Sequence, residues 1–152
     1  FAIGTFGMGE DPGAIEFNRP QSIGIDREHG ELVVTDACNH RLGVFTLDGK
    51  LIKWIGAGAG DGPEQFAYPY GLVLRPDHTA LVSEFGNHRV HHVDLETGKT
   101  LGLYGRPGRG EGEFTNPWAI AVIGDTVWVL DSGNDRVEGF RAPKLVRKAS
   151  AG

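Results

Sequence analysis

One turn recurs three times in this chain and constrains its fold more than any other feature. Each copy has an acidic residue, two further residues, Asn, one residue and Arg. The copies read DACNHR at 36–41, EFGNHR at 84–89 and DSGNDR at 131–136, so their arginines follow one another at intervals of 48 and 47 residues. A repeat of this period is typical of arrays, solenoids and propellers. We therefore interpret the 152 residues as three copies of one unit.

Short apolar runs surround each turn and predict four strands in each unit. A Phe-x-x-Pro sequence opens each copy, at 17–20, 66–69 and 114–117. Two runs follow each Pro, first at 22–25, 71–74 and 119–122, then at 31–36, 79–84 and 125–131. They are too short and too rich in β-branched residues for helices. A third strand is expected from each Arg, and fourth strands at 50–56 and 99–105.

Four-stranded antiparallel units at this spacing are typical of β-propeller blades, so we predict an all-β fold of three blades. Gly7, Gly56 and Gly105 are evenly spaced, which predicts that residues 1–7 are a further fourth strand. This strand would complete the last blade, giving twelve strands in a permuted order. The predicted units are 8–56, 57–105 and 106–141 with 1–7, followed by a C-terminal tail at 142–152.

The shared pattern resembles the NHL-repeat family of β-propellers. Both 39–41 and 87–89 read Asn-His-Arg, whereas the third copy carries Asp135 in place of His. The resemblance covers residues 1–141, and because family members are usually six-bladed rings, it implies half of a ring. We expect two chains to close this ring as a homodimer, with each N-terminal strand completing the last blade of the other chain. The alternative is that this chain is an excised half of a longer single-chain propeller.

Composition narrows the classes of partner. A net charge of −5 and a pI near 5.6 argue against binding of nucleic acids. The longest apolar stretch is far shorter than the roughly 20 residues that span a bilayer, so no membrane partner is expected. The single cysteine, Cys38, excludes a disulfide within the chain. The cellular compartment is left open.

The recurring turn is interpreted as structural, because catalysis rarely needs three copies of one site. The acids are expected to accept turn amides, the asparagines to adopt a left-handed backbone, and the arginines to pair with the acids. These residues are Asp36, Asn39 and Arg41, then Glu84, Asn87 and Arg89, and finally Asp131, Asn134 and Arg136.

Positions at which the copies differ are better candidates for binding. The residue after each Pro is Gln21, Tyr70 or Trp118, and aromatic side chains there could stack on a ligand. Together with Arg19, Tyr68 and Phe85 they form a predicted binding rim for a protein or peptide. The alternative is that Tyr70 and Trp118 only pack between blades.

The resemblance also implies an enzymatic alternative, since six-bladed relatives include metal-dependent amidating lyases and lactonase-like enzymes. Adjacent His91 and His92 point to opposite faces of a strand, and no histidine falls on the predicted first strands. His29 and His78 are expected at the opposite end of the blades from His40 and His88. We therefore expect no catalytic residue, no metal and no cofactor.

The predicted function is a non-enzymatic interaction scaffold. Two alternatives remain, namely a metal-dependent lyase or lactonase-like enzyme, and an engineered or excised propeller fragment with no ligand of its own.

Overall fold

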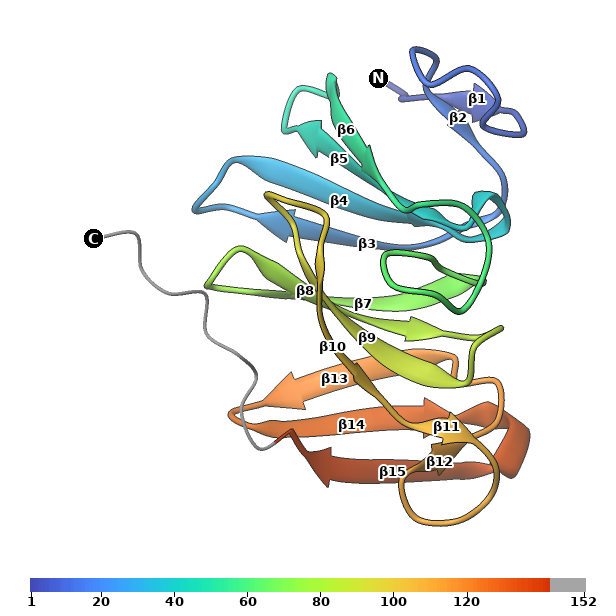
Figure 1. Ribbon diagram of the computed structural model, residues 1–152. Coiled ribbons are helices and arrows are strands. Elements are labelled where there is room, and N and C mark those ends of the chain that lie inside the picture. Colours follow the sequence, from blue (N-terminus) through green and yellow to red (C-terminus); the bar gives the residue numbers. More distant parts are fainter. Residues whose placement is uncertain (143–152) are drawn as a thin grey trace.

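Three antiparallel sheets stack face to face along the chain (Figure 1). The computed structural model describes residues 1–142. Each sheet is a meander in which consecutive strands pair. Blade 1 contains β3 (Pro20–Asp26), β4 (Glu31–Asp36), β5 (Arg41–Thr46) and β6 (Leu51–Ile55). Blade 2 contains β7 (Pro69–Arg75), β8 (Thr79–Glu84), β9 (Arg89–Asp94) and β10 (Thr100–Tyr104).

Blade 3 has three strands within the described residues: β13 (Ala119–Ile123), β14 (Thr126–Asp131) and β15 (Arg136–Arg141). The all-β fold and the hairpin order predicted from sequence are confirmed. The predicted tail lies outside the described residues except for Ala142, which is fully buried and donates its N–H to Asp125 O at 3.2 Å. No helix in residues 1–142 is long and apolar enough to cross a membrane.

Two apolar cores lie between the blades, one at each junction. The first joins Val33, Leu42 and Val44 of blade 1 to Ala80, Val82 and Val93 of blade 2. The second joins Leu81 and Val90 of blade 2 to Val127 and Val129 of blade 3. Strand alternation explains this division, because neighbouring residues such as Leu81 and Val82 point to opposite faces of one sheet. Blade 2 therefore contributes one face to each junction.

The Phe of each Phe-x-x-Pro sequence packs against the blade that it precedes or the junction beside that blade. Phe66 and Phe114 are buried in the first and second cores. Phe17 packs against Phe45 and Trp54 of blade 1, with ring centroids 5.8 and 6.0 Å apart. Burying an aromatic ring of this size contributes about 1.5–3 kcal/mol. The repeated Phe thus anchors the linker that enters each blade.

The inner strands β7 and β13 approach each other closely at Gly71. A Cβ atom there would lie 2.9 Å from Ala119 Cα and 3.0 Å from Ile120 N, both in the backbone of β13. Close approach of two backbones is a common reason for glycine in a strand. Glycine at position 71 therefore allows β7 to lie directly against β13.

Within each linker that precedes a blade, two short segments pair in parallel. This pairing bears on the predicted role of residues 1–7. β1 (Thr5–Phe6) pairs with β2 (Glu16–Phe17), and β11 (Arg106–Pro107) pairs with β12 (Glu113–Phe114). The linker before blade 2 has an equivalent bridge between Ala59 and Phe66. β1 is thus part of a linker, and its pairing within residues 1–142 is the parallel one with β2.

The alignment of Gly7 with Gly56 and Gly105, from which the N-terminal fourth strand was predicted, is wrong. Gly7, Gly60 and Gly108 are the equivalent glycines, because each donates its N–H to the carbonyl of the Phe that opens the next blade, at 3.1–3.2 Å. Gly7 therefore does not correspond to Gly56 and Gly105.

A longer first linker explains the error. Gly9 N–H donates to Glu16, seven residues further along the chain, whereas Gly62 reaches Gln65 and Gly110 reaches Glu113 over three residues. The extra residues displace the glycines and produce an even spacing by coincidence.

Candidate functional site

Three aromatic side chains form one cluster where blades 2 and 3 meet. Tyr70 of β7 stacks on Phe85 with ring centroids 4.7 Å apart. Trp118 meets both rings edge-on, at 5.0 Å from Tyr70 and 5.9 Å from Phe85. Trp118 is 47% exposed. The structure thus brings together three predicted binding residues, hereafter called the aromatic cluster (Tyr70, Phe85 and Trp118).

Hydrogen bonds fix the backbone around the aromatic cluster. Trp118 N–H donates to Leu130 O at 2.9 Å, and Trp118 O accepts from Ser83 Oγ at 3.2 Å. Phe85 N–H donates to Tyr68 O at 2.9 Å. A partly exposed aromatic surface is therefore presented on a backbone held by two blades.

The other predicted binding residues lie outside this cluster. Tyr68 packs edge-on against His40 at 4.5 Å, at the junction of blades 1 and 2. Arg19 and Gln21 are exposed on blade 1. Gln21 borders an open groove of about 540 Å³ on the free face of that blade.

The recurring acidic residue is a buried hydrogen-bond acceptor in every blade. Asp36, Glu84 and Asp131 are all fully buried. Each accepts the N–H of the residue after the linker Phe, at 2.7–2.9 Å. Each also accepts from the Asn of its own turn and from Nε of its own Arg, at 2.6–2.9 Å. The expected pairing of acid and Arg is present in all three copies.

The arginines continue this network into the linkers. Arg41 donates to Glu16 O, and Arg89 donates to Asp61 O and Gln65 O. Arg136 makes equivalent bonds to the carbonyls of Arg109, Gly110 and Glu113. Each turn therefore fastens its blade to the linker that precedes it.

The role expected for the asparagines differs from the one observed. Left-handed backbone occurs at the residue after each Asn, namely His40, His88 and Asp135, with φ of 52–53°. Asn39, Asn87 and Asn134 instead donate to the linker glycine carbonyl and to the turn acid. An amide side chain with two N–H groups can serve both acceptors at once.

Blade 2 extends its network with a buried histidine. His91 Nδ1 lies 3.0 Å from Glu84 Oε2, and both side chains have no exposed surface. Burial alone would raise the pKa of the Glu84 carboxyl, but hydrogen bonds from His91 and Arg89 outweigh it and hold the pKa below its usual value. The carboxylate form is therefore stabilised by the donors around it.

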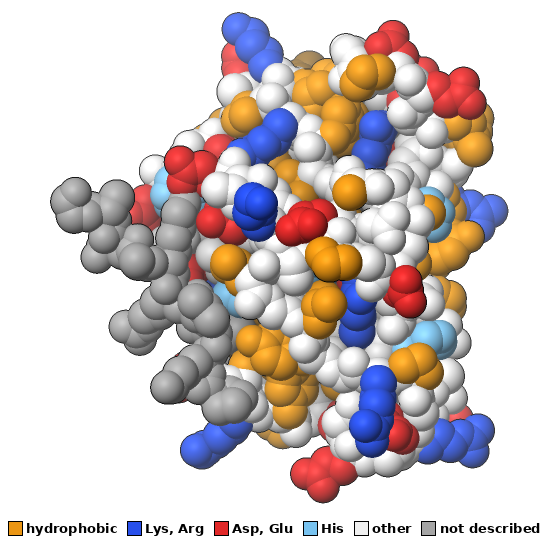
Figure 2. All heavy atoms as spheres, viewed as in Figure 1, with side chains coloured by type: hydrophobic (Ala, Val, Ile, Leu, Met, Phe, Trp, Pro, Cys, Tyr) orange, Lys and Arg blue, Asp and Glu red, His pale blue; other side chains and the backbone are white. Residues whose placement is uncertain are grey.

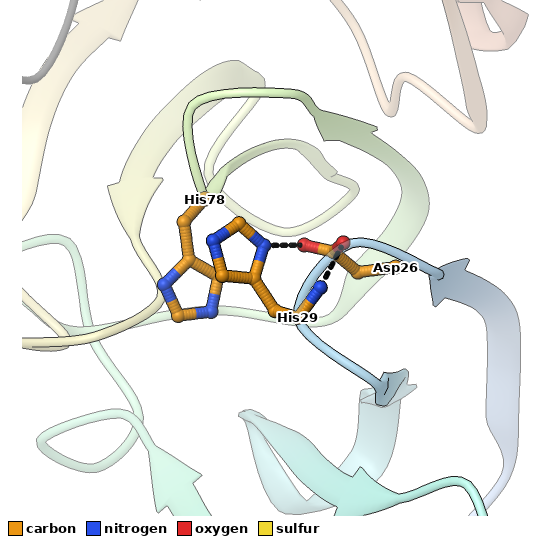
Figure 3. Close-up of side chains that lie close together, drawn as sticks. All are labelled: Asp26, His29 and His78. Carbon is orange, nitrogen blue, oxygen red and sulfur yellow. Dashed lines mark hydrogen bonds and ion pairs between the residues drawn. The ribbon is translucent and has the colours of Figure 1, made fainter.

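A second group of titratable side chains joins the hairpins of blades 1 and 2 (Figure 3). Asp26 ends β3, and His29 and His78 lie in the two hairpin turns. His29 Nδ1 lies 2.8 Å from Asp26 Oδ2, while His78 Nε2 lies 2.7 Å from Glu31 Oε2. The two imidazole rings stack, with centroids 4.0 Å apart. Sequence spacing indicated which end of the blades holds both histidines but did not indicate their contact.

The geometry of this group disfavours a shared metal ion. Asp26, His29 and His78 each offer a ligand atom within 4.8 Å of the others. An ion binds an imidazole nitrogen along its lone pair, in the plane of the ring. The two rings are only 14° from parallel, so one ion cannot lie in both planes unless a ring turns. The observed arrangement fits two His–carboxylate pairs better than a shared metal ion.

Charge on the molecular surface is mixed. Acidic and basic side chains are interspersed over the face shown in Figure 2, with no continuous basic patch there. A polyanion would meet repulsive carboxylates beside each cation on this face.

A family model decides the classification of the repeat. The model described as "NHL repeat" matches residues 17–45, from the linker Phe to the third strand of blade 1. Residues 17–45 therefore match an NHL repeat. The other two copies share the same acid–Asn–Arg network, as shown above.

Two relatives of this chain carry different names, one for its repeat and one for a lyase activity. The chain is 27% identical over 154 residues to NHL repeat-containing protein 2 of Gallus gallus, covering 82% of this chain and 21% of the relative. It is 28% identical over 109 residues to a probable peptidyl-alpha-hydroxyglycine alpha-amidating lyase of Caenorhabditis elegans, covering 68% and 29% respectively. The chain thus spans less than a third of either relative.

Solved structures support the same fold. A streptogramin B lyase superimposes with a TM-score of 0.63 at 18% identity, covering 88% of this chain and 39% of the lyase. At this identity the similarity concerns the β-propeller fold.

Proposed function

We propose that this NHL-repeat chain is a propeller module that binds a protein or peptide through the aromatic cluster. The observation that carries the proposal is a comparison of the two blade junctions. The positions of Tyr70, Phe85 and Trp118 at the second junction correspond to Gln21, Ala37 and Tyr70 at the first. Blades 1 and 2 stack around a continuous core without three aromatic residues there. The aromatic cluster therefore exceeds what stacking requires.

The aromatic cluster is chemically suited to bind an apolar or aromatic side chain of a peptide. Large rings supply contact area at low cost in conformational entropy, and Trp and Tyr are enriched among the residues that dominate binding energy. Trp118 combines 47% exposure with a backbone bonded on both sides. Little ordering of the protein would be needed on binding.

The test is a peptide selected on the wild-type chain from a displayed library, with its affinity then measured by fluorescence polarisation. Trp118→Gln introduces the residue found at the equivalent position of blade 1, so the fold should be retained. We expect affinity to fall at least tenfold. Leu103→Ala, at a residue 43% exposed on β10, is the matched control and should change affinity little. Equal binding by Trp118→Gln and wild type would contradict the proposal.

We also propose that a second copy of the chain completes the ring. Blade 3 exposes Trp128, Leu130 and Val137 on its free face, at 44–62%, and blade 1 exposes Ile23 and Ile25 at 64 and 59%. Repeat units of this kind bury such faces against neighbours. Light scattering should give twice the chain mass of 16.4 kDa. A chain that stays monomeric at high concentration would refute the dimer.

A lyase is the second candidate, favoured by the similarity to the amidating lyase of Caenorhabditis elegans over 109 residues. Metal analysis of the purified chain, with assay of peptidyl-α-hydroxyglycine cleavage, separates the two functions. Stoichiometric metal together with turnover would favour the lyase.

A further inference from the structure

The two internal junctions share one hydrogen bond that runs from a backbone amide to a histidine. His40 Nδ1 of blade 1 accepts from Tyr68 N–H of the linker before β7, at 3.1 Å. His88 Nδ1 of blade 2 accepts from Asn116 N–H, at 2.9 Å. Tyr68 and Asn116 both have left-handed backbone, with φ of 51° and 49°. The same backbone shape therefore directs an N–H group toward the preceding blade at each junction.

The free faces of the chain retain this backbone shape but carry different side chains. Arg19 stands at the position of Tyr68 and Asn116, with φ of 52°. Asp135 stands at the position of His40 and His88, also with φ of 52°. Arg19 is exposed, and no blade of the described chain lies before it. The donor position and the acceptor position thus remain available at opposite ends of the stack.

From these two positions we infer that Asp135 of one chain binds Arg19 of a second copy, and that this pair specifies how the proposed ring closes. The carboxylate of Asp135 can accept the N–H of Arg19, as the histidines do at the internal junctions, and can also pair with the guanidinium. Charge-assisted hydrogen bonds of this kind are stronger than neutral ones. The two departures from the repeat are therefore complementary in charge.

This pair also fixes the orientation of the two copies. Head-to-tail docking places Asp135 against Arg19 at both junctions and closes after one two-fold rotation. Docking of two like faces would oppose Arg19 to Arg19 or Asp135 to Asp135. Repulsion between like charges disfavours that arrangement.

Both free faces carry apolar residues suited to packing against each other. Trp128 of β14 occupies the register of Val33 and Leu81, which enter the cores of the internal junctions. The groove on blade 1 is lined by Phe17, Ile23, Leu32, Val34 and Phe45, among others, and has a volume of about 540 Å³. A side chain as large as Trp128 suits this groove.

Leu130 makes the proposed junction between two chains, hereafter the closing junction, more apolar than the internal junctions. It replaces Thr35 and Ser83, whose hydroxyls donate across the internal junctions to Tyr70 O and Trp118 O. The closing junction thus exchanges one neutral hydrogen bond for apolar contact and adds a charged pair.

This inference rests on the proposed dimer and is tested by charge exchange in the full chain. Dissociation constants from sedimentation velocity should rise at least tenfold in Asp135→Arg and in Arg19→Asp. The double exchange should restore most of the affinity, because the pair is re-formed with opposite polarity. Lys99→Asp, at an exposed residue of blade 2, is the control and should have little effect.

The outcomes distinguish this pair from the proposals on which it rests. A monomeric wild-type chain refutes both the dimer and the pair. A dimer whose affinity is unchanged in both single exchanges refutes the pair alone. Peptide binding is an independent readout, because the aromatic cluster lies between two blades of the same chain.

Discussion

Glu84→Gln should be among the most destabilising conservative substitutions in the chain. Oε1 of Glu84 accepts from Ala67 N–H and Asn87 Nδ2, while Oε2 accepts from Arg89 Nε and His91 Nδ1. Glutamine has one oxygen, so its amide NH₂ would face two of these donors. Arg89 is 7% exposed and would lose its anionic partner.

The size of the destabilisation depends on how deeply the acid–Arg ion pair is buried. Removing one member of a buried ion pair costs about 3–5 kcal/mol, against a total stability of about 5–15 kcal/mol for a typical domain. Asp131→Asn changes the same position in blade 3, where the Arg136 side chain is 32% exposed and reaches solvent. Its cost should be nearer 1.5–3 kcal/mol, the range for hydrogen bonds to charged groups.

Urea unfolding at pH 7, followed by tryptophan fluorescence and circular dichroism, measures these costs. Glu84→Asp is the control, because Asp36 and Asp131 fill the equivalent positions with the shorter acid. It keeps the charge but should lose contact with His91, at a cost of about 1 kcal/mol. A Glu84→Gln variant within 1 kcal/mol of wild type, or less affected than Asp131→Asn, would refute the reasoning.

Two further predictions concern packing and pH. Gly71→Ala should lower the free energy of unfolding by about 1–3 kcal/mol in urea, because the new Cβ meets the backbone of β13. Gly24→Ala meets only the side chains of Leu74 and Leu72 and should cost less. Equal costs would contradict the close approach. Burial lowers the pKa of His40, with Asp36 opposing, so the unfolded chain binds more protons and stability should fall as pH drops below about 6.5. His40→Asn should weaken this dependence in thermal melts, leaving the part due to His92, whose pKa burial also lowers. An unchanged pH profile in His40→Asn would contradict this role.

Strands and blades could be predicted from sequence because their determinants are local. Alternating apolar residues and the acid–Asn–Arg turn recur within each copy, and residues such as Asp36 and Arg41 bond within one hairpin. The same periodicity failed at residues 1–7, where equal spacing of glycines coincided with a longer first linker. The parallel pairing in the linkers and the hydrogen bonds of Gly7, Gly60 and Gly108 reveal the true equivalence.

Contacts between blades were harder to predict, since they depend on how whole sheets stack. Divergence from the repeat indicated Tyr70 and Trp118, and stacking brought them together with Phe85. The contact of His29 with His78 joins two hairpin turns, each of which has an ordinary turn sequence. The substitution of Asp135 for His was visible in sequence, but its meaning required the bond from Tyr68 to His40.

The hydrogen bonds from each Arg to the preceding linker indicate the boundaries of a segment that can be duplicated or transplanted as one blade. A segment 60–107 contains Glu84, Arg89 and the linker carbonyls of Asp61 and Gln65 that Arg89 binds. A boundary placed after the linker instead separates the guanidinium from those carbonyls. Duplication or transplantation of a blade should therefore begin at the linker glycine and end at the residue before the next one.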